Sequence, residues 1–277
     1  MRLLSWNIQW GRGIDGRVDL ARTATVMRGH AVDVLCLQEV ARFHPGLPGA
    51  ADEDQVARLT AAFAGFEVIY GIGSDLSDGS GGRRQFGNLV LSRFPVLQTF
   101  RHLLPWPPDA AVPSMQRVAV EAVVAAPFGP LRIVTCHLEY YSATQRMAQV
   151  AALRQLQVDG HRHAMSPRAA SESNPPFAVQ PRGEFAVFCG DFNSSSDSPE
   201  HQRIQAPVAD DVPPLVDAWT IAHPGVANAP TALGGKVCCD YFFVSANLAG
   251  RVGDVRVDGE TTASDHQSVV MELRDGV

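Results

Sequence analysis

Polar side chains follow the apolar runs of this chain at the point where each run ends, and this pattern limits the fold more than any other feature. The run Phe185–Phe188 leads into the segment CGDFNSSSD, which places Asp191 and Asn193 just beyond a strand-like stretch. The other polar residues placed in this way are Asn7, Glu39, His137, Asp265 and His266. Strand ends and the loops beyond them are where folds of helices and sheets commonly assemble sites. We therefore expect these side chains to meet at one edge.

The hydropathy pattern predicts more strands than helices. Strand-like runs occur at 3–8, 32–40, 66–71, 88–95, 117–125, 131–138, 184–191, 240–245, 251–258 and 268–273. Helical spacing is found after Asp19, over 54–63 and over 142–158. The glycine- and serine-rich stretch 71–87 is expected to be a loop, and about 165–184 a surface excursion. The pattern favours one domain, 1–277, of sheets covered by helices.

Composition excludes some classes of protein. The formal net charge of −6 argues against a chain that holds nucleic acid mainly by electrostatics, although a locally positive cleft stays possible. The five cysteines are odd in number and lack zinc-site spacing, so we expect reduced thiols. The sequence shows no secretory signal pattern and no apolar run that could span a bilayer, so we expect a cytoplasmic protein without an obligate protein partner.

The carboxylates at the strand ends point to a hard metal ion. Glu39, Asp191 and Asp265, with the amide oxygen of Asn7, form an all-oxygen set that suits Mg²⁺ or Mn²⁺. Each residue also has a simpler interpretation. Glu39 alone could be a surface acid, and Asp191 with Asn193 could make only an Asx turn. A shared site becomes the stronger hypothesis because so many strand ends are polar.

Two histidines lie beside these acids in the sequence. His137 and His266 could serve as general acids or bases, or donate to a phosphoryl oxygen, whereas His137 could also be an edge-strand residue with a satisfied ring. The glycine-rich stretch lacks the lysine and spacing of a phosphate-binding loop, and no serine stands in a nucleophile-elbow context. Metal-assisted hydrolysis is the chemistry that remains.

Eight short segments, in this order, resemble the endonuclease/exonuclease/phosphatase family. They are SWNIQWG, LCLQEV, GNLVLSRFP, VTCHLEYYSATQRMAQ, CGDFNSSSD, LVDAW, DYFFVS and SDHQSVVMEL, and they extend from Ser5 to Leu273. The resemblance implies an α/β fold, a four-layer α/β/β/α sandwich of two mainly antiparallel sheets flanked by helices. It also implies a divalent cation, usually Mg²⁺, and hydrolysis of a phosphoester by metal-assisted attack of water.

The resemblance assigns roles to residues by position. Glu39 would be the main metal ligand, with Asn7 and Asp265 nearby, and Asp191 would orient or deprotonate the attacking water. Asn193 would hold the phosphate, and His137 and His266 would bind phosphoryl oxygens. Asp217 would pair with one of these histidines and keep it charged, and Asn88 would support substrate binding at the rim. Gln9 stands where abasic-site endonucleases carry an aspartate, which puts a second metal ligand in doubt.

Three functions stay open for this sequence. The acidic balance favours a phosphodiesterase or phosphatase that acts on a small or lipid-derived phosphoester. The alternative is a nuclease or DNA-end-processing enzyme, which would gain support if Arg83, Arg84, Arg93 and Arg117 lined a groove continuous with Asp191. A catalytically inactive binding module of the same fold has the least support, because every polar group that the chemistry needs is present.

Overall fold

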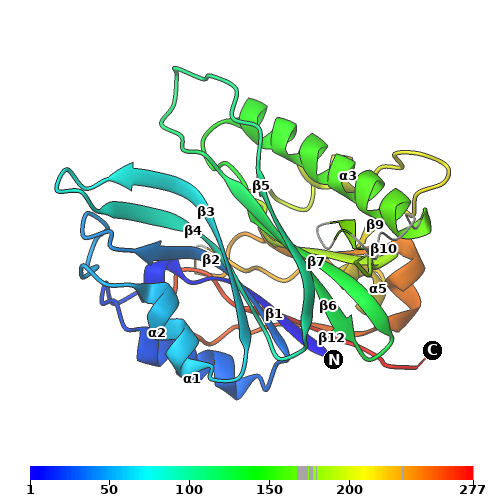
Figure 1. Ribbon diagram of the computed structural model, residues 1–277, viewed down its shortest axis with the longest axis horizontal. Helices are drawn as coiled ribbons and strands as arrows, with labels where there is room; N and C mark the ends of the chain where they lie inside the picture. Colours follow the sequence, from blue (N-terminus) through cyan, green and yellow to red (C-terminus); the bar gives the residue numbers. More distant parts are fainter. Residues whose placement is uncertain (167–173, 175–176, 179, 233, 277) are drawn as a thin grey trace.

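Two sheets packed face to face form the centre of the computed structural model, which describes residues 1–166, 174, 177–178, 180–232 and 234–276 (Figure 1). The first sheet has the strand order β11 (Val252–Val257), β12 (Val269–Leu273), β1 (Arg2–Asn7), β2 (Val34–Arg42), β4 (Arg83–Ser92) and β3 (Glu67–Ser77). The second has the order β5 (Val96–Leu103), β6 (Val118–Ala126), β7 (Gly129–His137), β8 (Phe185–Asp191), β10 (Asp240–Ser245) and β9 (Leu215–Asp217). In each sheet one central pair is parallel, β1 with β2 and β7 with β8, and the other pairs are antiparallel.

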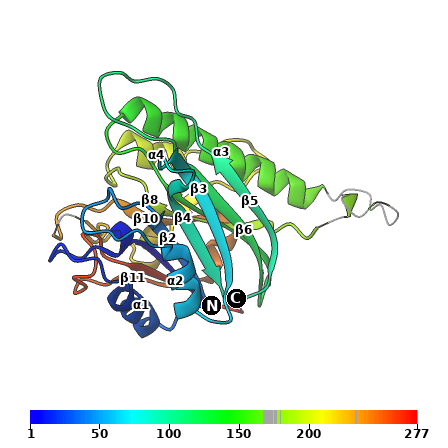
Figure 2. The ribbon, with the colours of Figure 1, turned by 60° about the vertical axis from the view of Figure 1, so that its left-hand side comes forward.

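Helices cover the outer face of each sheet. The views in Figures 1 and 2 place α1 (Leu20–Gly29) and α2 (Gln55–Ala62) against the first sheet and α3 (Ala143–Met165) against the second. The short helix α4 (Pro199–Gln205) packs beside α3. The α5 helix (Ala218–Ala222) contacts β11 at the end of the first sheet and β10 and β9 at the end of the second. Two 3₁₀ segments, η1 (Gln9–Gly11) and η3 (Ala246–Arg251), complete the described elements. The predicted four-layer sandwich is confirmed.

The layers follow from strands that are apolar on both faces, as expected when both faces are covered. On β1 and β2, Leu3 and Cys36 point between the sheets, where they join Val120 and other residues of the second sheet in one buried cluster. Leu4 and Leu35 point the other way and pack with residues of α1 and α2. A third cluster lies between α3, α4 and the second sheet.

The α1 helix forms as its sequence predicts. Asp19 is the N-cap, and its side chain accepts a hydrogen bond from the backbone N–H of Arg22 at 3.0 Å. Such a bond satisfies one of the unpaired donors at a helix start. Leu20, Ala24 and Met27 form the buried face.

The glycine-rich stretch 71–87, which we predicted to be a loop, is mostly a β-hairpin. β3 continues to Ser77 and pairs with β4 from Arg83 onward. Glycine serves close packing here: a Cβ on Gly87 would lie 1.9 Å from the carbonyl oxygen of Gly71 on the neighbouring strand. A Cβ on Gly71 would lie 2.3 Å from Cγ2 of Val120 in the opposite sheet. Gly87 therefore lets β3 and β4 pair closely and Gly71 lets the two sheets approach, which local composition alone does not reveal.

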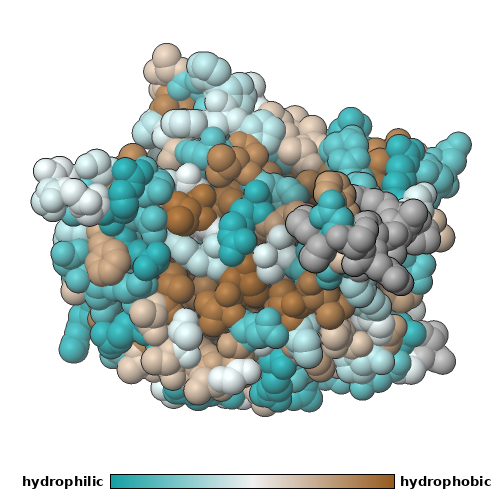
Figure 3. Space-filling view, in the orientation of Figure 1, coloured by the Kyte–Doolittle hydropathy of each residue, from teal (hydrophilic) through white to brown (hydrophobic). Residues whose placement is uncertain are grey.

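The edge strands β3 and β5 run side by side where the sheets meet. Figure 3 shows hydrophobic residues gathered in the middle of this face, with hydrophilic residues around them. Arg101 of β5 donates from Nε to the carbonyl oxygen of Tyr70 of β3 at 2.7 Å, which ties the two edges together.

Half of the surface excursion predicted at about 165–184 lies outside the described part of the chain, at 167–173, 175–176 and 179. Within the described residues, no helix has the length and apolar character needed to cross a membrane.

Candidate active site

The parallel strand pairs bring the predicted site residues to one edge. On β1 and β2, Asn7 lies opposite Gln38, next to Glu39. On β7 and β8, His137 lies opposite Asp191. Parallel neighbours end on the same side of a sheet, so each pair delivers polar residues to that side. The buried side chain of Gln38 also donates from Nε2 to Thr135 Oγ1 at 2.8 Å and thus joins the two sheets just behind the site.

Two residues of the site, and a glycine directly before Asp191, have unusual backbone conformations. Glu39 has φ of 59° and lies where the pairing of β2 with β4 shifts register, a bulge that turns its side chain out of the normal alternation. Asn193 has φ of 48°. Gly190 has φ of 135°, and a Cβ there would lie 1.9 Å from the carbonyl oxygen of Cys136. Strained positions of this kind cluster at functional sites because the surrounding structure fixes a particular side-chain direction.

Asn7 connects two of the carboxylates. Its Nδ2 donates to Glu39 Oε1 and to Asp191 Oδ2, each at 3.1 Å. Its Oδ1 accepts from the backbone N–H of Gln9 at 3.0 Å. The amide oxygen of Asn7 therefore faces the backbone in this orientation, and its role as a metal ligand stays a prediction. Its role here is to hold Glu39 and Asp191 together.

The carboxylates fit a hard divalent cation. Burial raises the pKa of Glu39 to about 7, and the negative charges of Asp191 and Asp265 add to the rise, against the hydrogen bond from Asn7. Asp265 Oδ2 accepts a hydrogen bond from Gln9 Nε2 at 2.7 Å. Gln9 therefore supplies no second carboxylate to the site and instead holds the carboxylate of Asp265 in place. A bound divalent cation would relieve the repulsion between these carboxylates, of which Asp191 is buried and Glu39 and Asp265 are partly buried. Glu39 and Asp265 are the residues that would hold it.

His137 is a neutral imidazole in this site. Its Nε2 lies 3.4 Å from Asp191 Oδ2, and its Nδ1 lies 3.9 Å from Glu39 Oε1. Burial lowers the pKa of His137 to about 3, and the guanidinium of Arg117 lowers it further, although Asp191 opposes this. The ring can therefore donate one N–H without carrying charge near neutral pH.

His266 is a charged imidazolium. Its Nδ1 pairs with Asp240 Oδ2 at 2.9 Å, and its Nε2 lies 3.7 Å from Asp191 Oδ2. Burial alone would lower the pKa of His266, but the carboxylates of Asp240 and Asp191 outweigh burial and raise it to about 10. The pairing with Asp240 therefore keeps the ring of His266 positively charged.

The prediction that Asp217 pairs with His137 or His266 is wrong. Asp217 Oδ2 pairs with His201 Nε2 at 3.1 Å and accepts from Asn228 Nδ2 at 2.8 Å, while its Oδ1 caps α5 through the N–H of Trp219. The segment LVDAW carries an acid at the start of a helix, and capping accounts for it. The residue that sequence reasoning missed is Asp240, which begins β10 directly opposite Asp191.

The two predicted asparagines differ in placement. Asn193 lines the cleft, with its N–H bonded to Asp191 Oδ1 at 2.9 Å and its Nδ2 donating to the carbonyl oxygen of Leu138. Asn88 is buried, donates to the carbonyl oxygen of Val118 at 2.8 Å, and is not among the described residues that line the cleft. Asn88 links β4 to β6 and lines a small neighbouring cavity with Arg117 and His137, so its part in substrate binding stays a prediction.

An open cleft of about 800 Å³ contains these groups. Glu39, His137, Asp191, Asn193, Asp265 and His266 line it together with an apolar and aromatic wall of Trp10, Leu47, Phe86, Met115, Tyr140, Tyr141 and Val237. Tyr140 and Tyr141 are each 58% exposed and pack edge to face, with ring centroids 4.8 Å apart. The aromatic wall was not predicted, although the adjacent tyrosines after His137 were a visible signal.

The arginines proposed to mark a nucleic-acid groove lie mostly elsewhere. Arg83 pairs with Asp75 at 2.9 Å, Arg84 donates to the carbonyl oxygen of Ser77, and Arg93 pairs with Asp33 at 3.3 Å. Among the described residues that line the cleft, Arg117 is the one arginine or lysine, and it is buried with its Nε 3.2 Å from Glu139 Oε2.

Two facing sheets with carboxylates, amides and imidazoles at one shared edge define a class of sandwich proteins with a polar site between the sheets. The sequence profile of the endonuclease/exonuclease/phosphatase family matches residues 4–266. The chain belongs to this family, which consists largely of metal-dependent phosphoester hydrolases.

Solved structures agree with the fold. An endonuclease/exonuclease/phosphatase from Beutenbergia cavernae DSM 12333 is 26% identical, with a TM-score of 0.73 over 99% of this chain and 71% of that chain. The human Nocturnin catalytic domain with bound sulfate anion is 17% identical, with a TM-score of 0.64 over 98% and 92%. A mannosyl-6-phosphatase of Bacteroides thetaiotaomicron is 17% identical, with a TM-score of 0.64 over 99% of both. Comparison with curated proteins gives no significant match.

Proposed function

We propose that this protein is a Mg²⁺- or Mn²⁺-dependent hydrolase of a small or lipid-derived phosphoester. The observation that carries the proposal is the convergence of Glu39, Asp191, His137 and His266 in one cleft, from strands of both sheets and from the loop before β12. Phosphoester hydrolysis needs a screened substrate charge, an activated water and stabilisation of the developing negative charge. The side chains of the cleft offer a group for each need.

Asp191 is the group that acts on water. It is buried, and it is held in place by Asn7 and by the N–H of Asn193. Two fixed donors leave the carboxylate oriented toward the cleft, where it can orient a water and take its proton. Glu39 and Asp265 would hold the divalent cation, which supplies charge neutralisation to the phosphoryl oxygens when bound.

The two histidines divide the work of binding phosphoryl oxygens. His266 brings a positive charge, since Asp240 keeps its ring protonated. His137 brings a neutral N–H donor. A fixed imidazolium in a partly buried cleft stabilises charge that grows on oxygen without moving at the moment of reaction.

The wall of the cleft favours a substrate with an apolar or planar part. Trp10, Phe86, Met115, Tyr140 and Tyr141 offer this surface beside the carboxylates. A nuclease would be expected to present several cationic side chains along the phosphate backbone, whereas Arg83, Arg84 and Arg93 are paired outside the cleft. One solved structure with this fold is named a mannosyl-6-phosphatase, and that name is consistent with a small phosphoester as the substrate here.

The experiment that tests the proposal is a screen of hydrolysis with and without EDTA. The panel comprises a p-nitrophenyl phosphodiester and monoester, nucleotides, inositol phosphates, phospholipid headgroups, single-stranded DNA and abasic DNA. We expect turnover of a small or lipid-derived ester, lost with EDTA and restored by Mg²⁺ or Mn²⁺. Preferred turnover of DNA would replace the proposed substrate class by a nuclease, and turnover that EDTA leaves unchanged would contradict the metal requirement.

We expect Glu39→Gln to weaken activation by Mg²⁺. The amide keeps the size of the side chain and can still accept the bond from Asn7, but it offers no negative charge to a cation. The concentration of Mg²⁺ that gives half-maximal rate should rise at least ~10-fold, the scale seen when metal-site partners are removed. Rates measured across a Mg²⁺ titration give this value, with the exposed Glu260→Gln as the matched control. An unchanged titration would remove Glu39 from the metal site.

A further inference from the structure

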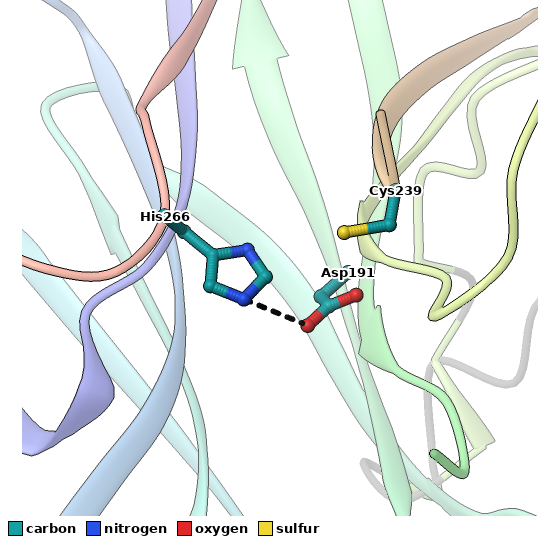
Figure 4. Close-up of side chains that lie close together, drawn as sticks. All are labelled: Asp191, Cys239 and His266. Atoms are coloured by element: carbon teal, nitrogen blue, oxygen red, sulfur yellow. Dashed lines mark ion pairs between the residues drawn. The ribbon is translucent and has the colours of Figure 1, made fainter. Parts of the chain in front are cut away.

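Three side chains in the cleft combine oxygen, sulfur and nitrogen donors. Asp191 ends β8, Cys239 directly precedes β10, and His266 lies three residues before β12. One donor atom of each lies within 4.8 Å of the others, and Figure 4 shows the sulfur turned toward the imidazole with the carboxylate beside them. All three residues line the cleft.

This donor set differs in kind from that of Glu39 and Asp265. Mg²⁺ prefers oxygen ligands and does not select sulfur. Thiolate, imidazole and carboxylate together are a set that Zn²⁺ accepts, and sites with three protein ligands keep a further position open for water. The open position here would face the cleft.

The surroundings of His266 match those of a metal-bound histidine. Its Nδ1 is engaged by Asp240 Oδ2 at 2.9 Å, which leaves Nε2 on the side of Asp191. Histidine ligands commonly use one ring nitrogen for the metal while a carboxylate holds the other. Thr231 fixes the same unit, because its Oγ1 donates to Asp240 Oδ2 at 2.6 Å and accepts from the N–H of Cys239 at 3.1 Å.

We propose that Asp191, Cys239 and His266 form a second cation site, one that takes a thiophilic divalent ion of the Zn²⁺ type in place of Mg²⁺. Binding releases the thiol proton and displaces the proton of His266, so both residues become ligands. Since Asp191 and His266 also serve the proposed hydrolysis, an ion in this site would inhibit it, and this consequence alone rests on the proposed function.

Cobalt spectroscopy tests the site without any assay of activity. Protein stripped of metal and kept reduced is titrated with Co²⁺, and a sulfur-to-cobalt charge-transfer band is expected at one Co²⁺ per chain, removed by added Zn²⁺. Cys239→Ser should lose the band and bind Zn²⁺ at least ~10-fold more weakly, because a direct ligand is worth no less than a supporting one. Cys238→Ser is the matched control, since Cys238 neighbours Cys239 in sequence and lies outside the donor set.

The outcomes separate this proposal from the proposed function. Absence of the band in the wild-type protein, or its persistence in Cys239→Ser with an unchanged thermal unfolding curve, would overturn the site whatever the enzyme hydrolyses. If Cys239→Ser unfolds, Cys239→Ala and the wild-type spectrum decide. In the rate assay at saturating Mg²⁺, Zn²⁺ should inhibit the wild type and Cys238→Ser, and Cys239→Ser should need at least ~10-fold more Zn²⁺ for the same fractional loss. Equal sensitivity would contradict the inhibitory role.

Discussion

Replacing Asp191 by asparagine is expected to lower kcat by at least ~100-fold, the scale for losing a general base. The variant keeps the size of the side chain and can still accept a hydrogen bond from Asn7, so the fold should persist. An amide cannot take a proton from water, and it brings no negative charge toward His137 and His266. The measurement is kcat at saturating Mg²⁺ on the phosphoester that the screen identifies.

The control for this substitution lies in the loop that follows β8. Asp197→Asn removes an exposed acid that bonds to Ser195, and it should leave kcat within about 2-fold, because surface changes away from the site have small effects. Thermal unfolding of both variants shows whether the fold is retained. If Asp191→Asn kept more than a tenth of the wild-type kcat while folded, Asp191 would not be the base.

The sequence could predict sheets covered by helices because the signals for strands and for helix starts are local. Alternating and continuous apolar runs specify strands with one or two buried faces, and Asp19 marks a helix start that the structure confirms. The hairpin at 71–87 was missed because its glycines are explained by contacts with Val120 and with the neighbouring strand. Such contacts lie far away in sequence. Strand β5 was also missed, because its half-buried residues give no clear alternation of apolar and polar side chains.

The candidate site was predictable to the extent that its residues sit at the ends of obvious strands. Asp191, His137, Glu39 and His266 meet as expected. The partner of His266 was not predictable, since two acids, Asp217 and Asp240, both neighbour strands and only pairing register distinguishes them. β10 runs antiparallel to β8, which puts Asp240 opposite Asp191, whereas Asp217 sits one strand further out, on β9. Local sequence carries no information on that register.

The register of β10 on β8 places Asp240 beside His266, and this pairing determines how the reaction depends on pH. The groups facing His266 are the carboxylates of Asp240, Asp191 and Asp265, which together raise its pKa to about 10. The imidazolium is the form that stabilises phosphoryl oxygens, so wild-type kcat/KM should hold through neutral pH and fall as pH rises through about 10. Asp240→Asn keeps an acceptor for Nδ1 but removes the nearest charge, so the pKa of His266 should fall.

The expected result is an alkaline limb that moves to lower pH in Asp240→Asn. Near pH 6 the wild type and Asp240→Asn should differ little, because we expect the ring of His266 to be protonated in both proteins. Near pH 9 the variant should lose at least ~10-fold in kcat/KM, approaching the ~100-fold that one charge-stabilising donor is worth. NMR titration of the His266 ring reports the same shift without turnover. Asp217→Asn is the matched control, because it removes a buried acid that pairs with His201 and leaves His266 untouched. An alkaline limb that moves in Asp217→Asn and stays in Asp240→Asn would return the role to Asp217 and refute the pairing described here.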